Sequence, residues 1–190
     1  EGIENIKTFI EKKEHVIFFT IHQSNWEIIV PTIDKLGVNV GAIYRHINNK
    51  FIDNLVLKKR NGCIDANKSF YTPKGKRSAK EILTAISNNS SVLVLVDQKD
   101  SAGENIKFFN QIVKTQTGFL KIARKHNMRL IPVKNIRYNL NHFKITFCPS
   151  IEPFKKNLSD IEAMNEIHKI IEKWILDNPT QWFWQHNRFN

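Results

Sequence analysis

Residues 92 to 96 form an uninterrupted apolar run, Val-Leu-Val-Leu-Val, between Ser91 and Asp97. A strand that is apolar at every position is buried on both faces, as strands are in a parallel sheet covered by helices. This run therefore predicts an α/β protein, with the polar Asp97 at the carboxyl end of a central strand.

The rest of the sequence alternates strand-like and helix-like segments. The predicted strands cover residues 15–21, 38–44, 63–66, 91–97, 130–133 and 142–147. The predicted helices cover residues 3–13, 26–37, 51–60, 78–87, 118–127 and 160–176, and residues 99–117 are expected to form a long loop. This alternation predicts a single α/β domain over residues 1–190, with a mostly parallel central sheet and helices on both faces.

A histidine and a carboxylate follow the first predicted strand, in the sequence His22-Gln-Ser-Asn-Trp-Glu27. Open α/β folds place their ligands at the carboxyl ends of sheet strands. Histidine exchanges protons near neutral pH, and Glu27, one helical turn further on, is positioned to fix its tautomer. The spacing is permissive, so a structural histidine, with Glu27 as the capping-box partner of Ser24, fits equally well. Pro31 is expected to kink or shorten the helix that follows.

The charge of the chain indicates an anionic partner. Lys and Arg number 29 against 18 Asp and Glu, which gives a formal net charge of +11. A positive charge of this size attracts nucleic acid, acidic lipid head groups and an acidic carrier protein alike. The isolated Cys63 and Cys148 argue against a disulfide scaffold and favour a reducing compartment.

Several motif classes are missing from the sequence. The histidines and cysteines lack zinc-ligand spacing, and there is no glycine-rich nucleotide-binding loop and no Gly-x-Ser-x-Gly.

Arg45 and Arg60 are candidates for anion recognition, although a solvated basic face explains a single arginine as well. Asp97 also fits a helix cap or a surface turn. The aromatic clusters 108–109 and 182–184 suit either a bilayer interface or the core.

Several sequence blocks occur in one order along almost the whole chain. They are His22–Glu27, Tyr44-Arg45 with Phe51-Ile52-Asp53, Arg60-Asn61-Gly62, Val96-Asp97-Gln98, Phe108-Phe109 with Thr115–Gly118, Pro132-Val133, and Pro179–Arg188. Together they resemble the late acyltransferases of lipid A biosynthesis, the lauroyl/myristoyl transferase family of the lysophospholipid-acyltransferase superfamily. Ser24 and Asn110 stand where that family commonly has glycine, and Pro31 interrupts the first helix.

This resemblance implies a glycerol-3-phosphate-acyltransferase-like fold and acyl transfer from acyl carrier protein to a hydroxyl of a lipid A precursor. His22 is then the general base and Glu27 the residue that orients it. Asn25, Tyr44, Arg45, Arg60, Asp97 and Gln98 become candidate substrate-binding residues. The resemblance calls for no metal and no bound cofactor.

The implied partners are acyl carrier protein, the lipid A precursor and an anionic membrane surface, with no nucleic acid expected. The implied location is the cytoplasmic face of the inner membrane of a Gram-negative bacterium. The chain begins at Glu1 without an initiator Met, so we expect a fragment or processed form that lacks an N-terminal membrane anchor.

Three alternatives remain open from the sequence. One is a glycerol-phosphate or lysophospholipid acyltransferase, although that branch more often has Asp at the position of Glu27. Another is a basic membrane-binding or nucleic-acid-binding module without catalysis. The last is a catalytically weak relative, which Ser24 and Pro31 leave possible.

Overall fold

The computed structural model describes residues 1–189, except for the side chains of residues 76–78 and 156. In chain order, the elements are α1 (Glu4–Glu11), β1 (Ile17–Thr20), η1 (Trp26–Ile28), α2 (Ile29–Lys35), β2 (Val40–Tyr44), α3 (Lys50–Asn61), β3 (Phe70–Pro73), α4 (Lys76–Ser87), β4 (Ser91–Leu95), β5 (Lys99–Phe108), β6 (Gln111–Thr115), α5 (Gly118–Lys125), β7 (Leu130–Asn139), β8 (His142–Phe147), η2 (Pro153–Lys156), α6 (Asp160–Asp177) and η3 (Pro179–Gln181).

Six strands form a mainly parallel sheet in the order β3-β2-β4-β1-β7-β8. β2 pairs in parallel with β3 and β4, whereas β7 and β8 pair antiparallel. The α/β class and the mainly parallel sheet flanked by helices, as predicted, are therefore confirmed. The antiparallel edge position predicted for residues 142–147 from their alternating pattern is confirmed by β8.

The chain divides into two compact units. The first contains Glu1–Asn5, Phe19–Trp26 and Leu95–Asn190, and the second contains Ile6–Phe18 and Glu27–Val94. No helix within residues 1–189 is both long enough and apolar enough to cross a membrane.

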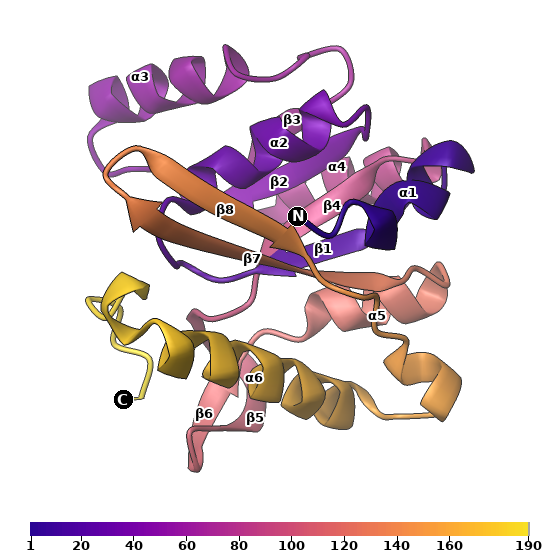
Figure 1. Ribbon diagram of the computed structural model, residues 1–190, viewed down its shortest axis with the longest axis vertical. Coiled ribbons are helices and arrows are strands. Elements are labelled where there is room, and N and C mark those ends of the chain that lie inside the picture. The colour runs from indigo at the N-terminus through magenta and orange to yellow at the C-terminus, as the bar shows by residue number, and fades with distance from the viewer. Residues whose placement is uncertain (190) are drawn as a thin grey trace. The chain divides into compact units, whose positions relative to one another are not determined.

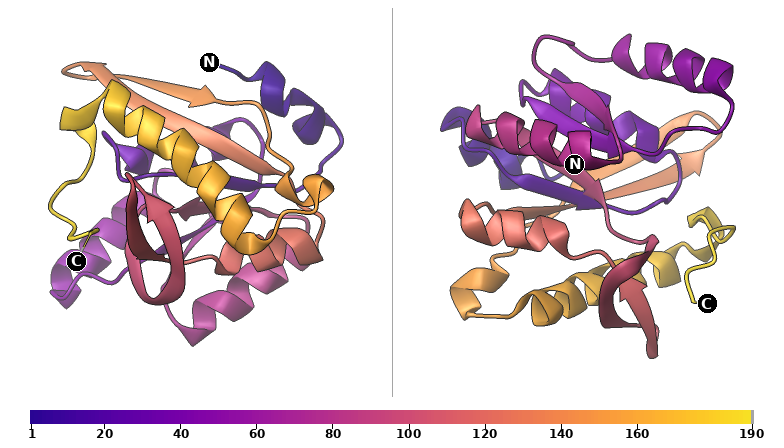
Figure 2. Two further views of the ribbon diagram at one scale, coloured as in Figure 1. Left: turned by 90° about the horizontal axis from the view of Figure 1, so that it is seen from below. Right: turned by 180° about the vertical axis from the view of Figure 1, so that it is seen from behind.

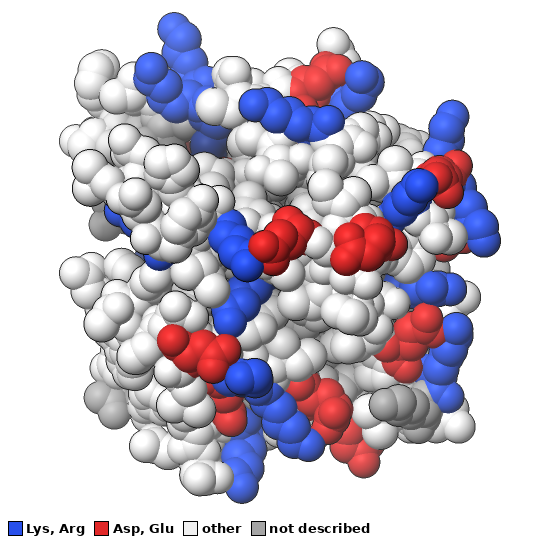
Figure 3. Space-filling model, viewed as in Figure 1, with Lys and Arg blue, Asp and Glu red and all other residues white. Residues whose placement is uncertain are grey.

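In the first unit, α6 provides the largest helical contribution to the core. A capping box starts this helix, because the Ser159 hydroxyl accepts the Glu162 N–H while the Glu162 carboxylate accepts the Ser159 N–H. Its buried side is formed by Ala163, Met164, Ile167, His168, Ile171, Trp174 and Ile175. This side packs against α5 and the β5–β6 hairpin, which lie beside α6 in Figures 1 and 2. Over α6, basic and acidic side chains are mixed (Figure 3).

The prediction of a long loop over residues 99–117 was wrong, because these residues form the antiparallel β5–β6 hairpin. Ile106 and Phe108 are buried while Lys107 between them is exposed, which is the period-two pattern of a strand. Phe109 and Asn110 form the two-residue turn, with φ of 47° and 61°. Both left-handed values are typical of a type I′ turn, in which Asn-Gly is the usual signal. Phe-Asn is not the usual sequence for such a turn, so the turn could not be predicted from the sequence pattern.

In the second unit, the strand predicted over residues 63–66 was also wrong, because the third strand is β3. The backbone there turns instead: the Asp65 carbonyl accepts the N–H groups of Lys68 and Ser69, at 2.9 and 2.8 Å. The Asp34 carboxylate fixes the same loop by accepting the Asp65 N–H at 2.9 Å. Pro31 shortens the predicted helix, as expected, since α2 begins only at Ile29 and the proline lies in its first turn.

The hairpin turn generates a stability prediction. We expect Asn110→Val to destabilise the protein by about 1 kcal/mol or more, because a β-branched residue is disfavoured in the left-handed conformation. We expect Asn110→Gly to keep or slightly increase stability, because glycine adopts this conformation without steric cost. Urea unfolding of both variants measures the difference, and equal free energies of unfolding would contradict the turn geometry.

Candidate active site

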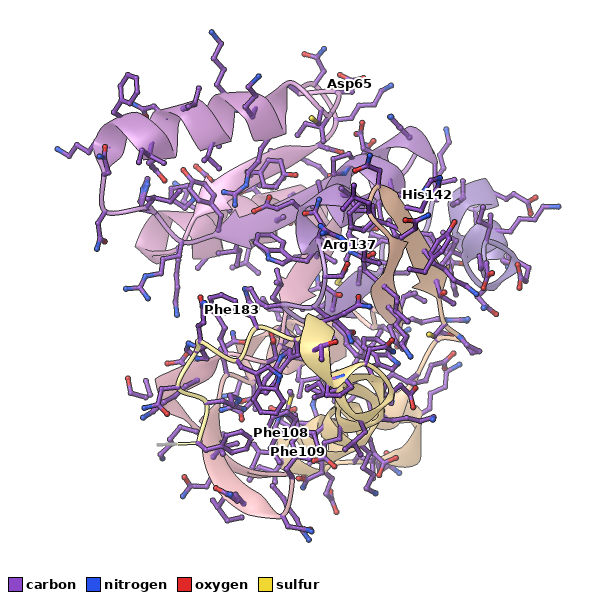
Figure 4. All side chains as sticks on the ribbon, turned by 60° about the vertical axis from the view of Figure 1, so that its left-hand side comes forward. Asp65, Phe108, Phe109, Arg137, His142 and Phe183 are labelled. Carbon is purple, nitrogen blue, oxygen red and sulfur yellow. The ribbon has the colours of Figure 1, made fainter. Side chains whose placement is uncertain are left out.

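The turn after β1 is held in place by the C-terminal segment of the same unit. The Ser24 N–H donates to the Gln181 carbonyl at 2.8 Å, and the Phe183 N–H donates to the His22 carbonyl at 2.9 Å. Gln23 and Trp182 form an antiparallel bridge between these bonds. Phe183 is labelled on this segment in Figure 4. The backbone of His22 is therefore clamped at the carboxyl end of β1.

His22 is oriented by Asp97, which follows β4. The Asp97 carboxylate bonds His22 twice: Oδ2 accepts the backbone N–H at 2.9 Å, and Oδ1 lies 2.8 Å from Nδ1. An ionised carboxylate only accepts hydrogen bonds, so Nδ1 carries the proton and Nε2 of the neutral ring keeps its lone pair. The sequence predicted an orienting role for Glu27, whereas in the first unit Asp97 makes the bond to Nδ1.

Asp97 is a buried acid with only 3% of its surface exposed. Burial acts to raise its pKa, but the hydrogen bonds and charge attraction from His22, together with the Trp182 indole N–H at 2.8 Å, outweigh burial and keep the pKa below its usual value. Asp97 therefore remains ionised near neutral pH.

The His22 side chain is partly accessible, since 16% of it is exposed. The Gln98 amide nitrogen lies 3.2 Å from Nε2, where it donates to the lone pair. The rings of Trp26 and Phe183 flank the imidazole at centroid distances of 5.4 and 6.4 Å. Asn25 contributes through its backbone carbonyl, which accepts the Asn135 side-chain N–H at 2.7 Å. An oriented histidine whose Nε2 contacts the Gln98 amide is thus present in the first unit.

In the second unit, Glu27 and Arg60 form a two-point ion pair. The Arg60 Nε donates to Glu27 Oε2 at 2.8 Å, and Nη2 donates to Oε1. The hydrogen bonding of Arg60 to the Glu27 carboxylate is the main reason why the pKa of Arg60 is raised. The alternative in which Ser24 caps the following helix is not observed for α2, whose N-cap position is Ile28 without a side-chain bond.

Two tyrosines flank the Arg60 guanidinium. Its central carbon lies 5.3 Å from the centre of the Tyr44 ring and 5.7 Å from that of Tyr71. Burial raises the pKa of both phenols, so they stay neutral. Of the predicted substrate-binding residues, Tyr44 and Arg60 thus lie together, whereas Arg45 is exposed on the chain segment after β2.

Sequence reasoning missed a histidine–carboxylate contact at the start of α3. His46 Nδ1 lies 2.5 Å from Asp53 Oδ2, and Asp53 Oδ1 accepts the Ile47 N–H at 2.8 Å. These bonds from Ile47 and then His46 lower the pKa of Asp53. The signal was a histidine seven positions before an acid, which is too common a spacing to identify a contact.

The partnership of Trp182 with Asp97 was also missed. An indole N–H is a donor that seeks a partner when buried, and Trp182 is buried. The aromatic cluster 182–184 was recognised in the sequence, but no sequence pattern indicated which acid Trp182 would contact. Within residues 1–189, no three His, Cys, Asp or Glu side chains gather closely enough to hold a metal ion.

The buried Asp97 generates a prediction about acid stability. Its folded pKa is lower than its usual 3.8, so its contribution to stability is fully present above that value and is lost as the pH falls through the folded pKa. We expect the free energy of unfolding to fall less steeply for Asp97→Asn than for the parent between about pH 5 and about pH 2. Urea unfolding across this range tests it, with Asp100→Asn as the control. Parallel curves for Asp97→Asn and the parent would contradict the prediction.

The Glu27–Arg60 pair generates a second prediction. In a double-mutant cycle with Glu27→Gln and Arg60→Gln, we expect a coupling energy of about 1 kcal/mol, because the pair is two-pointed and partly buried. The exposed Lys169–Glu166 pair on α6 is the matched control, and we expect it to couple by about 0.5 kcal/mol or less. Strictly additive effects at positions 27 and 60 would rule out an energetic role for the contact.

Comparison with known proteins gives a consistent result. A family model described as bacterial lipid A biosynthesis acyltransferase matches residues 1–190. The lipid A biosynthesis palmitoleoyltransferase of Escherichia coli (strain K12) is 23% identical to the chain, over 100% of this chain and 60% of that protein. The lipid A biosynthesis acyltransferase of Shigella flexneri is similar to the same extent.

The chain thus spans 60% of the length of these two relatives. The family match extends over His22, Glu27, Arg60 and Asp97, the residues that form the two clusters described above. The chain belongs to the bacterial lipid A biosynthesis acyltransferase family.

Proposed function

We propose that the chain transfers a fatty acyl group from the thioester of acyl carrier protein to a hydroxyl of a lipid A precursor. The observation that carries this proposal is the His22–Asp97 pair, in which Asp97 holds Nδ1 of a partly exposed imidazole and leaves the Nε2 lone pair for chemistry. The names of the two relatives, both lipid A biosynthesis acyltransferases, support a lipid A acceptor.

In this mechanism, His22 Nε2 removes the proton from the acceptor hydroxyl as its oxygen attacks the thioester carbonyl. The negative charge of Asp97 stabilises the imidazolium that forms, as the buried acid of a serine-protease triad does. The tetrahedral intermediate then collapses with cleavage of the carbon–sulfur bond, and the imidazolium returns the proton to the leaving thiolate. Ester and thiol are the products, so the step balances without metal or cofactor.

We assign anion binding to Arg60, for a phosphate of the acceptor. Glu27 holds its guanidinium in a fixed orientation, and the rings of Tyr44 and Tyr71 flank it. This replaces the orienting role first expected of Glu27. Gln98, which donates to His22 Nε2, is the group that the acceptor hydroxyl would displace.

The acyl donor, the membrane surface and the cellular location are part of the same proposal. The net charge of +11 favours both acidic acyl carrier protein and anionic phospholipid. We propose that the whole protein works at the cytoplasmic face of the inner membrane of a Gram-negative bacterium, where both substrates meet.

The test is transfer of a labelled acyl chain from acyl carrier protein to a tetra-acylated lipid A precursor in detergent micelles. We expect His22→Ala to lower kcat by about 10²-fold to 10⁴-fold, and Asp97→Asn to lower kcat with little change in KM. Circular dichroism of each variant verifies that it is folded.

His142→Ala is the matched control, because His142 is an exposed histidine on β8 of the same unit, and we expect it to behave as the parent. Full activity of a folded His22→Ala variant would overturn the proposed base. Transfer to lysophosphatidic acid but not to the lipid A precursor would overturn the proposed acceptor.

A further inference from the structure

The two sides of α3 differ sharply in what they contact. A helix repeats every 3.6 residues, so Asp53 and Arg60 lie on one side of α3, and Phe51, Leu55 and Lys58 lie on the other. The first side is occupied within its own unit, because Asp53 binds His46 and Ile47 and Arg60 binds Glu27. The second side is the outward side of the helix.

Large apolar side chains gather on this outward side. Phe51 is 78% exposed, and Ile52 and Leu55 are exposed next to it, with Ile47 just before the helix. Elsewhere, Ile112 and Leu176 are single exposed apolar residues on separate elements, and the pairs Tyr138 with Leu140 and Phe183 with Trp184 are smaller groups outside helices. Scattered single residues are normal on a protein surface, whereas a group on one helix face marks an interaction site.

Lysines border this apolar group. Lys50, Lys58 and Lys59 are exposed, and none of them has an ion-pair partner in the part of the chain that the structure describes. The only acid of α3 is Asp53, which faces the other side. Figure 3 accordingly shows white and blue atoms over α3, in contrast to the mixed charges over α6. The outward side of α3 therefore combines apolar side chains with uncompensated positive charge.

We propose that the outward side of α3, formed by Phe51, Ile52, Leu55, Lys58 and Lys59, docks the protein onto an anionic phospholipid surface. The apolar side chains insert among the lipid head groups, while the lysines pair with lipid phosphates. A bilayer needs no complementary groove, so three apolar side chains protruding from one helix suit it better than they suit a shaped protein partner. This arrangement would leave Arg60 and its partners on the opposite side of the helix.

The proposal adds a docking surface to the acyl-transfer proposal and rests on the exposure and charge of α3. Membrane binding is measured without turnover, and turnover in micelles is measured without a bilayer. Failure of one proposal is therefore distinguishable from failure of the other.

The experiment is co-sedimentation of the whole chain with vesicles of phosphatidylcholine alone or mixed with phosphatidylglycerol. We expect binding to the mixed vesicles that weakens with salt. Phe51→Ser/Leu55→Ser should reduce the affinity for mixed vesicles by about tenfold or more, and Lys58→Gln/Lys59→Gln should reduce both the affinity and its salt dependence.

Two matched controls are available elsewhere on the chain. Leu140→Ser removes an apolar side chain that is also 78% exposed, in the β7–β8 turn. Lys12→Gln/Lys13→Gln removes the same charge from another exposed lysine pair. We expect both controls to bind like the parent, and thermal unfolding confirms that each variant is folded.

Parent-like binding by the folded α3 variants would overturn the proposal, as would no binding by the parent to mixed vesicles. A monomer–dimer shift or a loss of acyl carrier protein binding that is caused by Phe51→Ser/Leu55→Ser, with vesicle binding unchanged, would assign this side to a protein partner instead.

Discussion

The buried negative charge of Asp97 is the constraint on which the candidate active site depends. Burying an ionised carboxylate is costly unless hydrogen bonds compensate it. Three donors do so: the backbone N–H and the imidazole of His22, and the indole of Trp182. These donors come from the two ends of the sequence, so the charge is stable only when the folded chain brings them together. The same bonds set the tautomer of His22, and thus link stability to the proposed chemistry.

The C-terminal segment consequently helps to hold the candidate site of the first unit in place. It bonds the backbone of the His22 turn, and further on it places Arg188 in the interior with 2% of its surface exposed. Arg188 donates to the Lys114 carbonyl at 2.7 Å and to the Thr115 hydroxyl at 2.5 Å, while burial lowers its pKa to about 10. Its guanidinium lies 5.3 Å from the Phe108 ring, which itself contacts Trp182. The β5–β6 hairpin, which the sequence pattern did not predict, therefore holds the C-terminal segment whose Trp182 bonds Asp97.

In the second unit, α3 has a comparable double role. Its inner side holds Arg60 against Glu27, and its outer side carries the apolar and basic residues that we assign to a lipid surface. Fixing the helix through Asp53 and Arg60 determines which residues remain outside. The proposed anion site and the proposed docking surface are thus two consequences of how one amphipathic helix is oriented.

The sequence alone determined the α/β class and the positions of most helices and strands, and it supplied the candidate residues for the proposed chemistry, because apolar periodicity and motif order are local properties. It failed at the Phe109-Asn110 turn, where two left-handed residues lack the usual glycine, and at residues 63–66, where Asp34 bonds the loop backbone. Only the tertiary structure decided the partners: Asp97 rather than Glu27 for His22, and Glu27 for Arg60. The physical reason is that hydrogen bonds join groups that are close in space, and spacing along the chain does not reveal which distant donor reaches a buried carboxylate.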